Sequence, residues 1–227
     1  MNHEPRNLSG LLLELPSRPI QRADIADLRG LSYQGKIGSS AWENFTFKSQ
    51  VALHHEDVTA SNPPYTYPVI CRRSGTRLLA LSIGREVIEY LMAERMGALS
   101  DLRMRRVSIG VDQLVKNLAD RPTDYALSFA HARAPAFGAS LRSLSFYGDD
   151  LAEAALFRDH LSLMVFFTCG IREAHGGAEV LRLGHDGAIS FQYTSQRRIL
   201  EVERVLTFLR EQGYFASDLW SGEGDRP

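Results

Sequence analysis

The stretch VICRRSGTRLLALSIGREVIEYLMAERMG, residues 69–97, decides the fold class. Two apolar runs flank Ser74-Gly75, and this pattern predicts a β-hairpin that turns at the glycine. Behind the hairpin, apolar residues recur at three- and four-residue steps from Val87 to Met96. They predict an amphipathic helix that ends at Gly97. A hairpin whose face is covered by the next helix is an α+β arrangement.

A similar succession recurs towards the end of the chain. AEVLRLGHDGAISFQY (178–193) predicts a second hairpin, and residues 195–213 carry the strongest helical pattern. The apolar stripe of this helix consists of Ile199, Val202, Leu206 and Leu209. We therefore expect antiparallel sheets with helices packed on one face, in two pseudo-repeated halves.

The expected halves are residues 1–100 and 101–215, and residues 216–227 are expected to form a disordered tail. In the first half, the spacing of Ser40 and Glu43 in SSAWENF predicts a short helix with a capping box.

The second half begins with the element order β-α-β-β-α-β over residues 104–174, which is the order of a ferredoxin-like unit. RRVSIGV predicts the first strand, and Asp112 is expected to cap the helix that follows. DYALSFAHA and ASLRSLSFY predict a strand pair. A helix from about Leu151 and the apolar strand LMVFFTCGI complete the order.

Composition limits the class of protein. The chain has 227 residues, 44% of them hydrophobic, and a net charge of −1, as is ordinary for a globular protein. Two cysteines without a CxxC motif disfavour a disulfide framework or a zinc site. No signal peptide is evident, and the longest apolar run is too short to span a membrane. We therefore expect a cytoplasmic protein without a membrane partner.

The tetrapeptide Tyr147-Gly148-Asp149-Asp150 resembles the acidic hairpin turn of RNA-dependent polymerases and palm-type nucleotide cyclases. Asp112 ends an expected strand upstream, so the resemblance covers about residues 105–166. It implies a site in which Asp112, Asp149 and Asp150 hold two Mg²⁺ or Mn²⁺ ions for nucleotide chemistry.

The residues after this turn depart from the palm pattern. LAEAALFRDHL has helical spacing where a palm domain continues as an apolar strand. Asp150 and Glu153 form a capping-box pair, and Asp149 and Asp150 would both accept backbone N–H bonds at the helix start. We therefore interpret the two adjacent carboxylates as helix caps.

Arginine is the second candidate signal, because the chain has 23 arginines and 3 lysines. Arginine recognises phosphate and carboxylate groups through its planar fork of donors. The candidate contacts to nucleic acid or to an acidic partner are Arg72, Arg73, Arg103, Arg105, Arg106, Arg133 and Arg142.

These patterns favour a non-catalytic binding or adaptor subunit of a larger assembly, without a cofactor. Its Arg-bearing loops and sheet edges would contact a protein partner or nucleic acid. The alternative is a metal-dependent nucleotide-processing enzyme that uses Asp112, Asp149 and Asp150 with Mg²⁺ or Mn²⁺.

Overall fold

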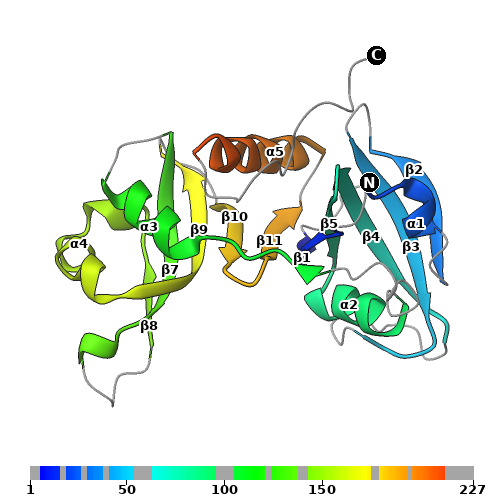
Figure 1. Cartoon of the computed structure of the whole chain (residues 1–227), viewed down its shortest axis with the longest axis horizontal. Coiled ribbons are helices and arrows are strands. Elements are labelled where there is room, and N and C mark those ends of the chain that lie inside the picture. The colour runs from blue at the N-terminus through cyan, green and yellow to red at the C-terminus, as the bar shows by residue number, and fades with distance from the viewer. Residues whose placement is uncertain are drawn as a thin grey trace. The chain divides into compact units, whose positions relative to one another are not determined.

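The chain divides into two compact units, each with an antiparallel sheet and helices (Figure 1). The computed structural model describes residues 6–15, 19–26, 30–37, 41–53, 63–95, 105–120, 124–137, 143–174, 179–193 and 196–212. The first unit comprises residues up to Val107 together with Gly187–Arg197. The second comprises Ser108–Asp186 and most of the last helix. The predicted tail, 216–227, lies outside the described residues.

The sheet of the first unit has the strand order β2-β3-β4-β5-β1-β11, and every neighbouring pair is antiparallel. Its strands are β1 (Arg6–Glu14), β2 (Leu31–Lys36), β3 (Trp42–Ser49), β4 (Tyr65–Ser74), β5 (Arg77–Ser82), β6 (Arg105–Arg106), which pairs with β1, and β11 (Ala188–Tyr193). Because β11 pairs with β1, the first unit draws strands from both of the expected halves.

The predicted hairpin and helix of residues 69–97 are confirmed within the described residues. β4 and β5 pair around Gly75, whose φ of 54° suits the glycine that the turn requires. The helix α2 (Arg85–Tyr90) packs on β1 and β5 and continues as a π-helical turn, η1 (Leu91–Arg95). The short helix α1 (Arg22–Ala26) contacts β2.

The core of the first unit forms where alternate strand residues meet α2. Leu11, Phe45, Val69 and Leu78 come from four strands and are buried together with Val87 of α2. The even spacing of these strand residues explains the burial, because successive side chains in a strand point to opposite faces.

The expected short helix around Ser40–Glu43 is wrong, because Trp42 and Glu43 begin strand β3. β3 has partners on both sides, β2 and β4, and the backbone bonds of these two ladders outweigh the capping box that Ser40 and Glu43 could form. Phe45 and Phe47 then point inward on one face and are fully buried.

The sheet of the second unit has the order β10-β9-β7-β8, again antiparallel throughout. Its strands are β7 (Tyr125–Arg133), β8 (Leu144–Tyr147), β9 (Val165–Glu173) and β10 (Glu179–Gly184). Its helical elements are α3 (Val111–Asp120), η3 (Pro135–Phe137), η4 (Leu151–Glu153), α4 (Ala155–His160), η5 (Leu161–Leu163) and α5 (Gln196–Glu211). The predicted stripe of α5 is confirmed, since Ile199, Val202, Leu206 and Leu209 are buried.

Helices α3 and α4 lie on one side of the β7–β9 strands (Figure 1). Phe157 of α4 contacts both Phe146 of β8 and Phe166 of β9, with ring centroids 5.1 and 5.6 Å away. Ala130 and Ala132 occupy the strand between those two, β7, and their small side chains leave room for the Phe157 ring. The strand pair β7–β8 was predicted correctly.

The element order predicted for residues 104–174 is present as β6, α3, β7, β8, α4 and β9, but the strand pairing is not that of a ferredoxin-like unit. Its first strand should join the sheet of the second unit, but β6 has only two residues and pairs with β1 of the first. Beyond it, Val107 and Ile109 each donate one backbone bond instead of forming a ladder, and Val111 already begins α3. Apolar alternation over five residues predicted the burial of these side chains correctly, but not their pairing.

Each unit contains one buried cysteine, Cys71 in β4 and Cys169 in β9. Burial raises the pKa of both thiols to about 12, so both are protonated at neutral pH. Within the described residues, no helix is both long and apolar enough to cross a lipid bilayer.

Candidate binding surface on the second unit

The turn after β8 is a helix cap at Asp150 but not at Asp149. The Asp150 side chain accepts a hydrogen bond of 2.9 Å from the Ala152 N–H at the start of η4. Asp149 instead forms an ion pair with Arg172 of β9, and its own side chain is 98% exposed. The predicted capping is therefore confirmed for Asp150 and wrong for Asp149, since a cross-strand arginine competes for the second carboxylate.

Asp112 serves the fold in a third way. It lies in the first turn of α3 and not at its cap, because the helix already begins at Val111. One carboxylate oxygen accepts the Phe166 N–H of β9 at 3.0 Å, and the other accepts Lys116 at 2.8 Å. Asp112 thus ties α3 to the sheet that it covers.

The three aspartates therefore have three separate sets of partners: Asp112 with Phe166 and Lys116, Asp149 with Arg172, and Asp150 with Ala152. Among the residues that the structure describes, no group of three or more His, Cys, Asp or Glu side chains has an arrangement that could hold a metal ion. A two-metal site requires carboxylates whose oxygens converge on the same pair of metal ions. Here the oxygens of each aspartate accept from a different protein donor.

A chain of side-chain contacts starts at Tyr147, the last residue of β8. Its ring lies 4.9 Å from the ring of Phe129 in β7, its direct cross-strand neighbour. The guanidinium of Arg182 in β10 stacks over Phe129 at 4.3 Å. Such stacking holds both groups in place and leaves the guanidinium edge available for hydrogen bonds.

Gly170 makes this arrangement possible. It lies in β9 between the strands that carry Phe129 and Arg182. A Cβ at this position would lie 2.0 Å from the Glu179 carboxylate, so the missing side chain is what lets Glu179 cross the strand. Glu179 accepts bonds from Ser128 at 2.9 Å and from Arg182 at 3.2 Å. The surface is therefore built from four strands, and we call it the Tyr147 surface.

The β8 strand forms the edge of this surface. Its only strand neighbour among the described residues is β7. Gly148 donates its N–H to Ser128, so the alternation of an antiparallel ladder turns the backbone N–H and C=O groups of Ser145 and Tyr147 away from β7. Tyr147 is 73% exposed, the largest exposure of any large apolar or aromatic side chain described.

Exposed apolar side chains continue along the chain after this edge. Leu156 on α4 is 68% exposed, and Leu163 of η5 and Val165 of β9 are also exposed.

Most of the candidate arginines in described positions carry intramolecular partners. Arg73 bonds to Glu43, Arg105 to Glu14, and Arg106 to Glu89. Arg133 stacks on the ring of Phe167 at 5.0 Å, and Arg72 is half-buried in β4. Arg103 and Arg142 lie outside the described residues. A carboxylate that already neutralises an arginine lowers its attraction for phosphate.

Sequence reasoning found Tyr147 only as part of a motif and missed Phe129, Gly170, Glu179 and Arg182. Their grouping depends on the register of four strands, which no local pattern contains. A glycine inside the apolar strand pattern of β9 was the one available signal, since such a glycine marks a close approach of another group. No protein-family model matches the chain, and no curated protein matches its sequence.

Proposed function

We propose that the protein is a non-catalytic adaptor of the cytoplasm that binds an extended segment of a partner protein along the edge of β8. The partner segment would add a strand to the sheet and bond to the outward N–H and C=O groups of Ser145 and Tyr147. The Tyr147 ring would anchor one of its side chains. The exposure of Tyr147 beside its rigid neighbour Phe129 is the observation that carries this proposal.

A binding role for the Tyr147 ring is energetically more favourable than a structural one. A tyrosine side chain buries a large apolar area at low entropic cost, and tyrosine is enriched among the residues that dominate protein interfaces. At 73% exposure, Tyr147 gives the fold little of that energy. The four-residue β8 is also short, which limits self-association through the same edge.

Two substitutions test the proposal. Tyr147→Ala removes the anchor, and Ser145→Pro removes one outward N–H that the fold itself does not use. The chain offers matched controls: Tyr33→Ala removes an exposed tyrosine from the edge strand β2 of the first unit, and Ser145→Ala keeps the backbone donor.

The measurement is quantitative co-purification of partners from the source cells with the tagged full-length chain. We expect one set of proteins to be lost with both Tyr147→Ala and Ser145→Pro and retained with both controls. A photoreactive phenylalanine analogue at position 147 should crosslink to the same set. Equal recovery by all five chains would refute the proposal.

Nucleic acid is the second form of partner for the same adaptor role. It receives less support, because Arg73, Arg105 and Arg106 are bonded to carboxylates. Mobility shifts with single- and double-stranded polynucleotides test this alternative. Binding that weakens steeply from low to high salt would indicate that the partner is a nucleic acid and not a protein.

A further inference from the structure

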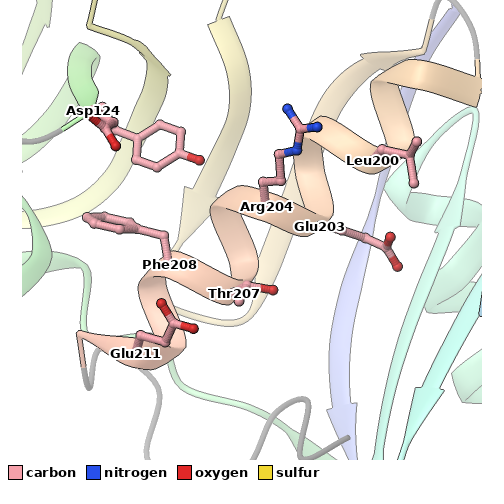
Figure 2. Close-up of a pocket in the computed structure, with 8 residues that line it drawn as sticks. Asp124, Leu200, Glu203, Arg204, Thr207, Phe208 and Glu211 are labelled. Carbon is pink, nitrogen blue, oxygen red and sulfur yellow. The ribbon is translucent and has the colours of Figure 1, made fainter. Parts of the chain in front are cut away.

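The second unit contains a pocket whose described lining residues include none of the residues of the Tyr147 surface. It has a volume of about 430 Å³ and lies between the start of β7 and one face of α5 (Figure 2). This volume is within the usual range of ligand-binding pockets, which is roughly 300–1,000 Å³. The pocket belongs entirely to the second unit, so a single compact unit determines its shape.

Two aromatic rings form one part of its wall. Tyr125 of β7 and Phe208 of α5 have ring centroids 4.8 Å apart, with an angle of 51° between the ring planes. Figure 2 shows Phe208 projecting from α5 towards the strand end that carries Asp124. Aromatic ring faces attract cations, so two rings in a pocket wall favour a cationic ligand.

The charges around the rings are mostly negative. Among the described residues, Asp124, Glu203 and Glu211 line the pocket together with one positive residue, Arg204, which gives these four a formal net charge of −2. Burial raises the pKa of Tyr125, and the Glu173 and Asp124 carboxylates raise it further. Arg204 lowers this pKa, but by less than either carboxylate raises it, so the nearby charges give a negative potential at the Tyr125 ring.

Glu211 occupies a position that the helix dipole disfavours. It is the last residue of α5, where the helix dipole favours positive side chains and disfavours a carboxylate. The buried stripe of α5 lies on other positions, Ile199, Val202, Leu206 and Leu209. The face of α5 that carries Arg204, Phe208 and Glu211 thus contributes to the pocket and not to the core.

We propose that this pocket binds a guanidinium group, stacked on Phe208 and Tyr125 and bonded to the carboxylates of Glu211 and Asp124. A guanidinium is planar, so it can stack on an aromatic face while its edge donates to carboxylates. The group can come from a small guanidino compound or from an arginine side chain of a peptide. Neither source depends on the edge of β8, so this proposal is independent of the adaptor role.

The probes are N-acetyl-arginine amide, the blocked pentapeptide Gly-Ser-Arg-Ser-Gly, and the same two molecules with citrulline in place of arginine. Citrulline keeps the shape and removes the charge. Calorimetric titration of the full-length protein should show at least about tenfold weaker binding of each citrulline probe. If the peptide binds better than the blocked amino acid, the source is a peptide; equal affinity indicates a small compound.

Variants on the pocket assign the binding to it. Phe208→Leu keeps the apolar volume and should weaken binding of the arginine probe about fivefold. Glu211→Gln should weaken it by a similar factor, and because this residue is exposed at a helix end, circular dichroism can check that the variant keeps the wild-type fold. Arg204→Gln removes a positive charge from the pocket wall and should strengthen binding.

Tyr33→Ala is the matched control, since it removes an exposed aromatic ring from the first unit, outside the pocket, and should leave the affinity unchanged. Equal binding of the arginine and citrulline probes would overturn the proposal. So would an arginine affinity that is the same in the wild type, Phe208→Leu and Glu211→Gln. Failure of either kind leaves the β8 experiment unaffected.

Discussion

The carboxylate of Glu43, only 2% exposed, lies in a doubly bonded ion pair with Arg73. Arg73 Nε donates to one carboxylate oxygen at 2.9 Å and Nη2 to the other at 3.1 Å, while Nη1 bonds to the Ile20 carbonyl at 3.1 Å. Arg22 donates to the same carboxylate. A residue that sequence reasoning treated as a phosphate contact is therefore part of the interior of the first unit.

Replacement of Arg73 by alanine should destabilise the protein by about 3 kcal/mol, because it leaves the buried Glu43 carboxylate without its main partner. Urea unfolding checks this loss. Arg105→Ala is the control, since its ion pair with Glu14 is at the surface and should contribute less than about 1 kcal/mol. Similar losses in the two variants would contradict the assignment.

The pH dependence of stability should reveal the same carboxylate. Burial by itself raises the pKa of Glu43, but the hydrogen bonds and charges of Arg73 and Arg22 outweigh burial and lower the pKa below its ordinary value of 4.5. The contribution of Glu43 is therefore complete above pH 4.5 and is lost as the pH falls through the folded-state pKa.

Glu43→Gln tests this, because glutamine cannot titrate. The difference in unfolding free energy between wild type and Glu43→Gln should be constant from pH 7 to about pH 5 and should then shrink as the pH falls. A difference that grows towards acid would contradict the lowered pKa.

The turn after β8 separates the helix-cap and metal-site interpretations. Asp150→Ala should cost about 1 kcal/mol through loss of the bond to the Ala152 N–H. Asp149→Ala should change stability by less than about 0.5 kcal/mol, since that side chain is almost fully exposed.

Thermal unfolding with and without Mg²⁺ or Mn²⁺ completes this test. A bound ion stabilises the folded state by mass action, so a specific site would raise the melting temperature of the wild type. We expect no such rise. A metal-dependent gain that disappears in Asp149→Ala and Asp112→Ala would favour the nucleotide-processing enzyme.

Replacement by alanine should destabilise the protein by different amounts at Gly10 and at Gly170. In Gly10→Ala the new methyl group would lie 1.8 Å from the backbone oxygen of Ala80 in the neighbouring strand, and we expect a loss of about 3 kcal/mol. In Gly170→Ala it meets the end of the flexible Glu179 side chain, and about 1 kcal/mol should suffice. Urea unfolding of both variants compares the losses directly, and a larger loss for Gly170→Ala would contradict this interpretation.

Local patterns predicted the elements more reliably than their partners. The turn at Gly75 and the stripe of α5 were predictable because both depend on residues close in sequence. The short helix at Glu43 was wrong because strand pairing on both sides of β3 overrides a local cap. After Arg106 the opposite holds: residues 107–110 form no ladder, and α3 begins at Val111.

The candidate sites were less predictable than the fold, because each joins distant residues. Phe129 of β7 contacts Arg182 of β10 although β9 lies between these strands. Tyr125 of β7 contacts Phe208 of α5, which is distant in the sequence. Neither contact follows from periodicity, and both depend on the register of the sheet and the placement of α5.

The two buried thiols allow the rate of opening to be measured for each unit separately. An alkylating reagent attacks only a thiolate in contact with solvent, so Cys71 and Cys169 should react only after their surroundings open. Because one thiol resides in each unit, peptide-resolved alkylation would time the two openings separately in a single unmodified sample. Equal alkylation rates of Cys71 and Cys169 would mean that the two units unfold together. Different rates would show which unit opens more slowly.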